Sequence, residues 1–374
     1  MNNNIAIIGA SYLQLPLIKK AKEMGYRTHV FAWAANDVGE IEADLFYPIS
    51  IVEKEQILDQ CKKIGICGVC SIASDLAVIT VNYVADKLGL TGNSLDSTYK
   101  STNKHAMRNA FEAHGDPSPK SILFEKEQEL DDVDILFPAI VKPTDRSGSR
   151  GIFKVSSKEE AKKVAKDSLA QSLEHKALIE EFVEGQEYSV EYISYQGKHF
   201  FLAMTQKYTT GAPHFIETGH LEPAQVSDDT LSRTKAIVEH ALDTLDIKYG
   251  ASHTEVKIDK NGDIKIIEIG ARMGGDCIGS DLVRYSTGFD FVKMVIEVAC
   301  GKKPDFIKVG EPIAVESIFI FDRKDLDEFN RLRHEKPDEI LEIVDMHPER
   351  IGQITDSSNR AGCYIRKAHP DTTV

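Results

Sequence analysis

The sequence predicts a mixed fold, in which a parallel α/β unit is followed by a longer, mainly antiparallel α+β region. Over about the first 90 residues, short apolar runs alternate with helical stretches that end at glycine, as in a parallel sheet with crossover helices. After Gly115, strand-like runs follow one another with few helices between them. Two of these runs are joined by Asn261-Gly262, a strong signal for a hairpin turn.

The N-terminal unit is predicted from apolar runs that each precede a helical stretch. The run IAIIG at residues 5–9 leads into a helix from Leu13 to Met24. The turn between them, GASYLQ, has a single glycine, so it favours a plain strand-to-helix turn over a dinucleotide site. The pattern repeats as a strand RTHVFAW, a helix near 53–64, a strand near 66–73 and a helix near 75–88.

Residues 101–115 predict a further helix, with Ser101 or Thr102 as N-cap and Gly115 at its end. Helices are also expected over 157–172 and 228–245 and near 288–300, followed by a mixed C-terminal tail. The strand-like runs of this region are PKSILF, FPAIVKP, GIFKVS, KALIEEFV, EYSVEYIS and KHFFLAMTQKY. Because few helices separate them, an antiparallel arrangement is expected.

The charge balance limits the kind of partner. The net charge of −14 argues against nucleic acid as the main partner, since phosphate contacts along a polyanion need clustered Lys and Arg. It leaves room for a nucleotide such as ATP, whose charge a few local cations can balance. No run approaches 18 apolar residues and the start MNNNIAIIGAS has no basic segment, so we expect no membrane span, no signal peptide and a cytoplasmic protein.

The six cysteines do not form a disulfide framework in a chain of 374 residues. Cys67 and Cys70 have the C-x-x-C spacing of some metal and redox sites, and Cys61 lies nearby. Both sit in the apolar stretch IGICGVCSIA, and no second Cys or His pair lies at zinc spacing. A buried strand with free cysteines is therefore the favoured interpretation.

Residues 141–152, VKPTDRSGSRGI, place a lysine at the end of an apolar run and two glycines after it. By itself this stretch is consistent with a surface hairpin or with a flexible cover over phosphates. It is not a Walker loop, because Lys142 precedes Gly148 and Gly151 and no helix begins there.

The hairpin HTEVKIDKNGDIKIIEIG brings two acids together. If the strands pair outward from Asn261-Gly262, Glu255 faces Glu268, and Lys257 faces Ile266 in the next pair on that face. Like charges that are directly opposed are destabilising, so a compensating cation is expected. Mg²⁺ is usually held by one or two carboxylates and substrate phosphates, although a solvated acidic pair also fits this pattern.

The segment GARMGGD follows the second strand directly. It supplies Arg272, whose fork of donors suits phosphate oxygens, and three glycines that permit close backbone approach. Such an arginine can stabilise charge that develops during phosphoryl or acyl transfer.

In this order, these motifs resemble those of the ATP-grasp superfamily of carboxylate–amine ligases, with a biotin-carboxylase-like layout. Within it the chain looks most like the L-amino-acid ligases, which join amino acids into dipeptides. The stretches that carry the second resemblance are FIETGHLEPA, HTEVK, EIGARMGGD and SSNRAGCYI. One departure is Gly270, where many members have an asparagine, which puts a third side-chain ligand in doubt.

The resemblance implies a fold with four segments. We expect an N-terminal Rossmann-like α/β domain over residues 1–95 and a linker helix over 96–115. A small lid subdomain over 116–184 and a C-terminal ATP-grasp subdomain with an extension over 185–374 would complete it.

The resemblance also implies nucleotide contacts. Lys104 and Lys142 would contact ATP phosphates, and the loop with Ser147, Gly148, Ser149 and Gly151 would close over them as a lid. Glu180 would accept from the adenine amino group, the backbone of Phe182 and Val183 would form the adenine hinge, and Glu187 would bind the ribose.

The remaining roles concern metal and substrate. Glu255 and Glu268 would hold Mg²⁺, with Mn²⁺ as an alternative, and Arg272 would steady an acyl phosphate. Arg272 and the backbone N–H groups of Gly274 and Gly275 would be candidates for oxyanion stabilisation. The ammonium of one substrate would lie near Glu217 and the reacting groups near His220, and Asp276 would line the acceptor pocket and favour a polar or cationic amine.

The function implied is ATP-dependent ligation of a carboxylate to an amine through an acyl phosphate, with L-amino acids or similar small molecules as substrates. A purine-biosynthesis-type enzyme and a D-alanine–D-alanine-like ligase share the nucleotide site and remain alternatives. A catalytically inactive ATP-binding regulator is a third. Family resemblance also suggests a homodimer.

Overall fold

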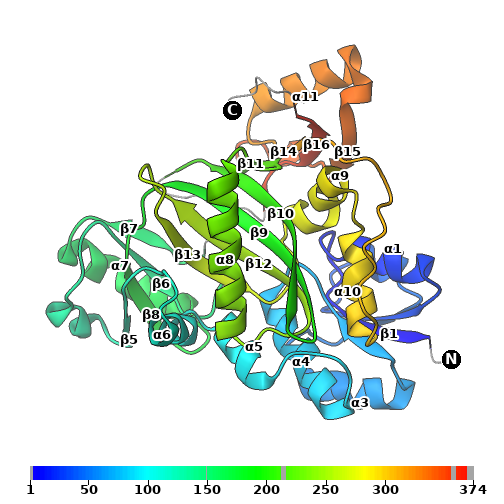
Figure 1. Ribbon diagram of the computed structural model, residues 1–374, viewed down its shortest axis with the longest axis horizontal. Helices are drawn as coiled ribbons and strands as arrows, with labels where there is room; N and C mark the ends of the chain where they lie inside the picture. Colours follow the sequence, from blue (N-terminus) through cyan, green and yellow to red (C-terminus); the bar gives the residue numbers. More distant parts are fainter. Residues whose placement is uncertain (1–2, 149, 212–215, 355–358, 369–374) are drawn as a thin grey trace.

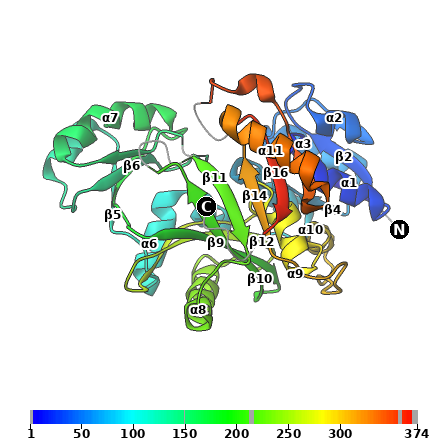
Figure 2. The same cartoon turned by 90° about the horizontal axis from the view of Figure 1, so that it is seen from above.

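Three sheets organise the chain in the computed structural model, which describes residues 3–148, 150–211, 216–354 and 359–368. A parallel sheet forms the N-terminal unit, a small antiparallel sheet (the lid sheet, named after the predicted lid subdomain) lies within residues 121–181, and an eight-stranded antiparallel sheet lies between them (Figure 1). The lid and the N-terminal unit lie on opposite sides of the large sheet (Figure 2).

The N-terminal sheet has the order β3-β2-β1-β4 and confirms the predicted parallel unit. Its strands are β1 (Asn4–Ile8), β2 (Arg27–Phe31), β3 (Leu45–Tyr47) and β4 (Gly68–Cys70), with helices α1 (Leu15–Glu23), α2 (Val38–Glu42), α3 (Lys54–Ile64) and α4 (Asp75–Leu88). The sequence prediction lacked α2 and β3. They span 5 and 3 residues, too few to show a periodicity.

The turn after β1 is filled by a side chain of the protein itself. The Gln14 amide donates to the Ile72 carbonyl at 2.8 Å, and Ser11 Oγ donates to Gln14 Oε1 at 2.8 Å. A Cβ at Gly9 would lie 2.9 Å from Gln14 Oε1, so this glycine makes room for the glutamine. This packing accords with the prediction of a plain strand-to-helix turn.

Two helices, α5 (Leu95–Thr102) and α6 (Lys104–His114), follow the N-terminal unit. The N-cap of α6 is Asn103, whose side chain accepts from the amides of His105 and Ala106. The predicted caps Ser101 and Thr102 were therefore wrong, because both belong to α5. Gly115 ends α6 in a left-handed conformation, as predicted.

The lid sheet has the order β5-β8-β6-β7 and is antiparallel throughout. Its strands are β5 (Ser121–Phe124), β6 (Ala139–Pro143), β7 (Phe153–Val155) and β8 (Ala177–Glu181), and helix α7 (Lys158–Gln171) packs on them. Ala161 and Ala165 of α7 share an apolar core with Val141 and Ile179. The strand β6 thus holds Lys142 at its end.

The large sheet has the order β13-β12-β9-β10-β11-β14-β16-β15. Its strands are β9 (Gln186–Tyr195), β10 (Lys198–Thr209), β11 (Glu217–Glu222), β12 (Gly250–Ile258), β13 (Ile264–Gly270), β14 (Val315–Phe319), β15 (Ile340–Val344) and β16 (Cys363–Lys367). Glu217 and His220, the residues expected near the substrates, both lie in β11 between β10 and β14.

Two helices cover this sheet. α8 (Asp228–Thr244) packs Val238 and Leu242 on Tyr192 of the sheet. α10 (Phe291–Ala299) lies between the sheet and the N-terminal unit, where it shares a core with Ile7 and Leu17 (Figure 1). The short helix α9 (Val283–Thr287) precedes α10, and α11 (Arg323–Glu335) belongs to the C-terminal segment.

The cysteines are free thiols, and Cys61 and Cys70 are buried. Cys67 Sγ lies 3.9 Å from Cys300 Sγ. No cluster of three metal-ligating side chains of the His, Cys, Asp and Glu types occurs in the described part of the chain. The described helices also include none long and apolar enough to cross a membrane.

Glu222, at the end of β11, is fully buried and accepts hydrogen bonds from Thr205 and Ser286. Burial raises the pKa of its carboxyl to about 7, so the folded protein holds this proton at pH values where the unfolded chain has released it. The ionised form therefore costs stability above pH 7, and the cost disappears as the pH falls toward the unfolded value.

We expect Glu222→Gln to stabilise the protein at pH 8 by on the order of 2–3 kcal/mol, and by little at pH 5. Thermal unfolding at both pH values measures this, with the exposed Glu112→Gln as control. An equal change at the two pH values would contradict the expectation.

Candidate functional site

A cavity of about 190 Å³ lies where the lid sheet, α6 and the β12–β13 hairpin meet. It gathers most of the residues predicted from sequence: Lys104, Lys142, Ser147, Gly148, Glu180, Phe182, Val183, Glu187, Glu217, Glu255, Glu268 and Arg272. His220, Gly275 and Asp276 lie outside this lining, as does Gly151, which packs against Gln171. Ser149 lies outside the described residues.

Glu255 and Glu268 are cross-strand partners, as predicted, but the register that pairs them differs from the prediction. The loop runs from Asp259 to Asp263, whose backbones pair at 3.0 Å, so the turn is longer than the expected two-residue Asn-Gly turn. A bulge then shifts the pairing after Glu255, and Ile267 is the extra residue.

The new register corrects one predicted contact, since Lys257 faces Lys265 instead of Ile266. The bulge itself is anchored from outside the hairpin. Arg108 Nη2 donates to the Ile267 carbonyl at 2.6 Å, and the Ile266 amide donates to the Pro117 carbonyl at 2.7 Å.

The two acids are compensated by lysines from other elements. Lys104 Nζ donates to Glu268 Oε1 at 2.7 Å, and Lys207 Nζ donates to Glu255 Oε1 at 2.6 Å. Lys104 also donates to the carbonyl of Arg146 at 2.7 Å, which ties the predicted lid loop to the two acids.

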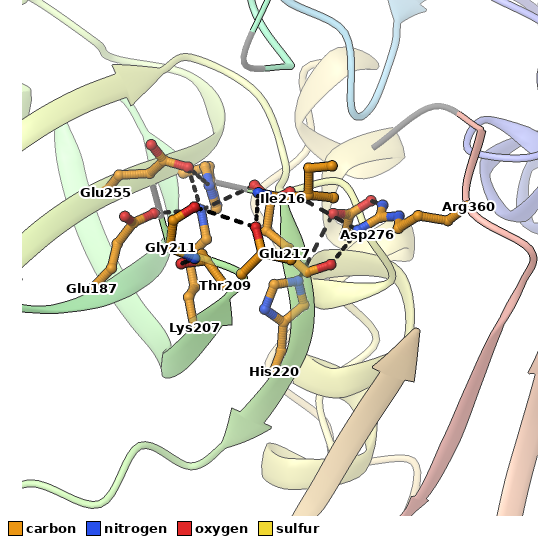
Figure 3. Close-up of polar contacts among 12 residues, drawn as sticks. Glu187, Lys207, Thr209, Gly211, Ile216, Glu217, His220, Glu255, Asp276 and Arg360 are labelled. Atoms are coloured by element: carbon orange, nitrogen blue, oxygen red, sulfur yellow. Dashed lines mark hydrogen bonds and ion pairs between the residues drawn. The ribbon is translucent and has the colours of Figure 1, made fainter. Parts of the chain in front are cut away.

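Lys207, in β10, was not among the predicted site residues. Its buried ammonium lies 2.6 Å from Glu255, 2.9 Å from Glu187 and 3.8 Å from Glu217 (Figure 3). Burial alone would lower the pKa of Lys207, but the three carboxylates raise it well above its usual range. It therefore joins the predicted ribose, metal and substrate acids.

A buried carboxylate–imidazole pair lies beside the acids that the sequence predicts to bind metal. Glu191 contacts Nδ1 of His253 and accepts from the Gly274 amide at 3.1 Å, and His253 Nε2 lies 3.6 Å from Glu255 Oε1. Burial alone would lower the pKa of His253, but Glu191 outweighs it and raises the pKa to about 9. His253 lines the cavity.

Arg272 is held by the N-terminal unit. Its Nε donates to Asp75 Oδ1 at 2.8 Å and its Nη2 to Asp75 Oδ2 at 3.1 Å, a two-point contact that fixes the guanidinium plane. A Cβ at Gly270 would lie 2.9 Å from Asp75 Oδ1 and 3.2 Å from Arg272. Glycine at 270 thus leaves space for this ion pair, and no side-chain ligand is present there.

At the adenine end predicted from sequence, Glu180 is engaged by two cations. Arg108 Nε donates to it at 2.9 Å and Lys142 Nζ lies 2.6 Å from it, with all three side chains buried. Burial opposes ionisation, but the two cations hold the pKa of Glu180 below its usual value. The Glu180 carboxylate therefore positions Lys142. Arg108, the other cation bound to Glu180, was absent from the prediction.

The predicted hinge has lysines around it. Lys154 Nζ lies 3.6 Å from the centre of the Phe182 ring and Lys257 Nζ lies 5.0 Å from it. Lys257 also donates to the Val183 carbonyl at 3.3 Å. Phe182 and Val183 both face the cavity, together with Glu181, which the prediction did not include.

The predicted substrate residues Glu217, His220 and Asp276 form a second cluster next to the cavity, here called the substrate cluster. Arg360 bridges Glu217 and Asp276, and His220 Nε2 lies 3.9 Å from Asp276 Oδ2 (Figure 3). Neither ring nitrogen of His220 has a hydrogen-bond partner among the described residues, and burial lowers the pKa of its ring. Tyr12, from the N-terminal turn, lines a small adjoining pocket with Asp276 and Arg360.

The chain is similar in sequence to one known family and to several known proteins. Residues 135–281 match the family model of the ATP-grasp domain. The alanine–anticapsin ligase of Bacillus subtilis is 26% identical over 327 residues, which cover 78% of this chain and 68% of the relative. Matches to three alanine–anticapsin ligases span 63–68% of those proteins.

Solved structures give the same picture of the fold. The L-amino acid ligase from Bacillus licheniformis superposes with a TM-score of 0.81 at 22% identity, covering 99% of this chain and 94% of that one. Phosphoribosylglycinamide synthetase from Anaerococcus prevotii superposes with a TM-score of 0.77 at 24% identity, covering 98% and 94%. The predicted fold class and the predicted resemblance are confirmed.

Proposed function

We propose that this chain is a member of the ATP-grasp superfamily, whose domain model matches residues 135–281, and that it is an ATP-dependent ligase that joins a carboxylate to an amine through an acyl phosphate. L-Amino acids are the proposed substrates, and ADP and phosphate are the proposed by-products. The similarity to alanine–anticapsin ligases and to an L-amino acid ligase structure supports this choice within the superfamily.

One observation carries the proposal most strongly. A single cavity is lined by Lys104, Lys142, the opposed pair Glu255 and Glu268, and Arg272. Cations and metal-binding acids in one partly enclosed space suit phosphoryl transfer, in which positioning and charge neutralisation provide most of the catalysis.

The acids fit Mg²⁺ or Mn²⁺. Glu255 and Glu268 stand on opposed strands, and their carboxylates would hold the ion together with nucleotide phosphates. When bound, the ion would neutralise charge on the transferring phosphoryl group. The Arg272–Asp75 pair fills the space beside Gly270, so no side chain at position 270 can bind the ion. Further ligands to the ion would therefore come from the phosphates of ATP.

In the first proposed step, a substrate carboxylate oxygen attacks the γ-phosphorus of ATP, and the bond to the β-phosphate oxygen breaks to release ADP. Lys142 is fixed for this step by Glu180, and Arg272 by Asp75. Both cations are thus oriented before the reaction, which reduces the cost of reorganisation.

In the second step, the amine attacks the acyl carbon, loses a proton, and inorganic phosphate leaves, giving an amide. The Gly274 N–H already donates to Glu191, which argues against Gly274 as an oxyanion donor. The Gly275 amide has no acceptor within the described residues, so Gly275 together with Arg272 remains the proposed oxyanion contact. Glu217, His220 and Asp276 are proposed to surround the substrates.

ADP release tests this function directly. We expect Mg²⁺-dependent ADP release to rise at least tenfold over the basal rate with particular L-amino acids, added singly and in pairs. Mass spectrometry of the same mixtures should detect a dipeptide. If none of the twenty amino acids stimulates ADP release, the amino-acid ligase assignment is wrong.

A further inference from the structure

Arg360 belongs to the C-terminal segment, and its side chain contacts the substrate cluster described above. It belongs to the stretch SSNRAGCYI, to which the sequence comparison gave no role. Its side chain is only 5% exposed. Nη2 donates to Asp276 Oδ1 at 2.5 Å, and Nη1 donates to the Glu217 carbonyl at 3.1 Å and lies 3.9 Å from the Glu217 carboxylate.

The Arg360 guanidinium lies over an aromatic ring. Its Cζ lies 3.6 Å from the centre of the Phe319 ring, and the His220 ring meets the same phenylalanine edge-on at 5.6 Å. A stacked guanidinium with two directed hydrogen bonds cannot be replaced by lysine, which is a point charge without a plane. Phe319 therefore fixes Arg360 and His220 relative to each other.

Asp276 depends on such an anchor because its backbone is strained. Asp276 and Cys277 have φ values of 50° and 64°, the left-handed region that residues other than glycine seldom adopt. Two consecutive residues in that region persist only where surrounding contacts hold them. The bond from Arg360 is such a contact, and the Arg360 charge holds the pKa of Asp276 well below its usual range despite burial.

The contacts in Figure 3 leave an excess of negative charge. Five carboxylates lie along this chain of contacts against three cations, Lys207, Arg360 and the His253 imidazolium; the carboxylates belong to Glu187, Glu191, Glu217, Glu255 and Asp276. The Glu217 carboxylate has neither Lys207 nor Arg360 at hydrogen-bond distance, because Lys207 lies 3.8 Å and Arg360 3.9 Å away. Its carboxylate therefore retains capacity to accept from a ligand.

We propose that Arg360 is a positioning residue that holds Glu217 and Asp276 as a paired acidic wall for the ammonium group of an amino-acid substrate. This inference rests on the proposed ligase function. Arg360 supports the two acids from the side of the C-terminal segment, while Glu217 also lines the main cavity. The consequence is selection for carboxylates that bear an ammonium group over the same acids without one.

The first half-reaction can be isolated with hydroxylamine, which traps an acyl phosphate as a hydroxamate and replaces the amine substrate. The readout is the ratio of kcat/KM for the preferred amino acid to kcat/KM for its analogue lacking the amino group. We expect Arg360→Met to lower this ratio about 10–100-fold, the loss of one or two charge-assisted hydrogen bonds, mainly through KM for the amino acid.

Four comparisons separate a positioning role of Arg360 from general damage to the protein. Arg360→Lys should not restore the ratio, whereas added methylguanidinium should partly restore it in Arg360→Ala. Asp276→Asn should lower the ratio, and combining it with Arg360→Met should add little. Arg331→Met, which removes an exposed arginine of α11, should leave the ratio unchanged. The affinity for ATP should stay within about twofold of the wild-type value in every variant. This measurement also serves as the control that each variant is folded.

An unchanged ratio in Arg360→Met or Arg360→Lys with intact ATP binding would overturn the role of Arg360 and leave the ligase function standing. An equal loss of kcat/KM for both acids would also overturn it. A wild-type protein that forms no hydroxamate from any amino acid would refute the proposed function, and with it this inference.

Discussion

Replacing Arg272 with methionine is expected to lower kcat for amino-acid-dependent ADP release by about 10³-fold, the scale of an arginine that stabilises transition-state charge. The reason is the two-point contact with Asp75, which fixes the guanidinium at the edge of the main cavity. ATP affinity should change by no more than about threefold, because the lysines remain. Single-turnover kinetics and nucleotide titration measure the two quantities.

Asp75→Asn provides the matched test, since it keeps the shape of the partner and removes its charge. We expect a smaller loss of kcat, about 10-fold, and little further loss when it is combined with Arg272→Met, as for residues in one interaction. Glu112→Gln, on the exposed face of α6, should behave as wild type. Equal losses in ATP affinity and kcat would indicate that Arg272 acts in binding instead.

Replacing Glu268 with glutamine is the second change with a large expected effect. It removes one of the two opposed carboxylates and the partner of the buried Lys104. We expect the Mg²⁺ concentration for half-maximal activity to rise at least tenfold and kcat to fall about 10²-fold, since even indirect metal partners contribute 10–100-fold.

Titration of activity with Mg²⁺ and with Mn²⁺ measures this change, and direct Mn²⁺ binding in the presence of ADP gives a readout that is independent of turnover. Glu255→Gln should act in the same direction, because the acids are cross-strand partners. An unchanged metal dependence in both variants would contradict the assignment of these acids to the metal.

The Glu255–Glu268 pair illustrates how a correct prediction can rest on a wrong intermediate step. The sequence predicted a two-residue turn at Asn261-Gly262, but the turn in the structure is longer. The bulge at Ile267 adds one residue to the second strand and restores the pairing at Glu255. Nothing local in the sequence marks that bulge, because its anchors are Arg108 and Pro117.

The residues that the sequence did not identify share one property, namely long-range partners. Lys207 reads as one polar residue in a long strand, and its role depends on acids from β9, β11 and β12. Glu191 and His253 are cross-strand partners whose separation in sequence is 62 residues. By contrast, the parallel N-terminal unit was predictable because alternating strands and helices leave a local periodic pattern.

The placement of Tyr12 and Arg360 has a consequence for how such a protein can change its substrate. The cations and acids proposed for ATP chemistry lie mostly within or near residues 135–281, whereas the pocket around Asp276 is closed by side chains from near the two ends of the chain. With the proposed roles, substrate selectivity can therefore change through substitutions near the two ends of the chain while the residues proposed to bind ATP stay constant. Chimeras that exchange those terminal segments between relatives are therefore expected to change the proposed selection of the amino-acid substrate while the affinity for ATP stays constant.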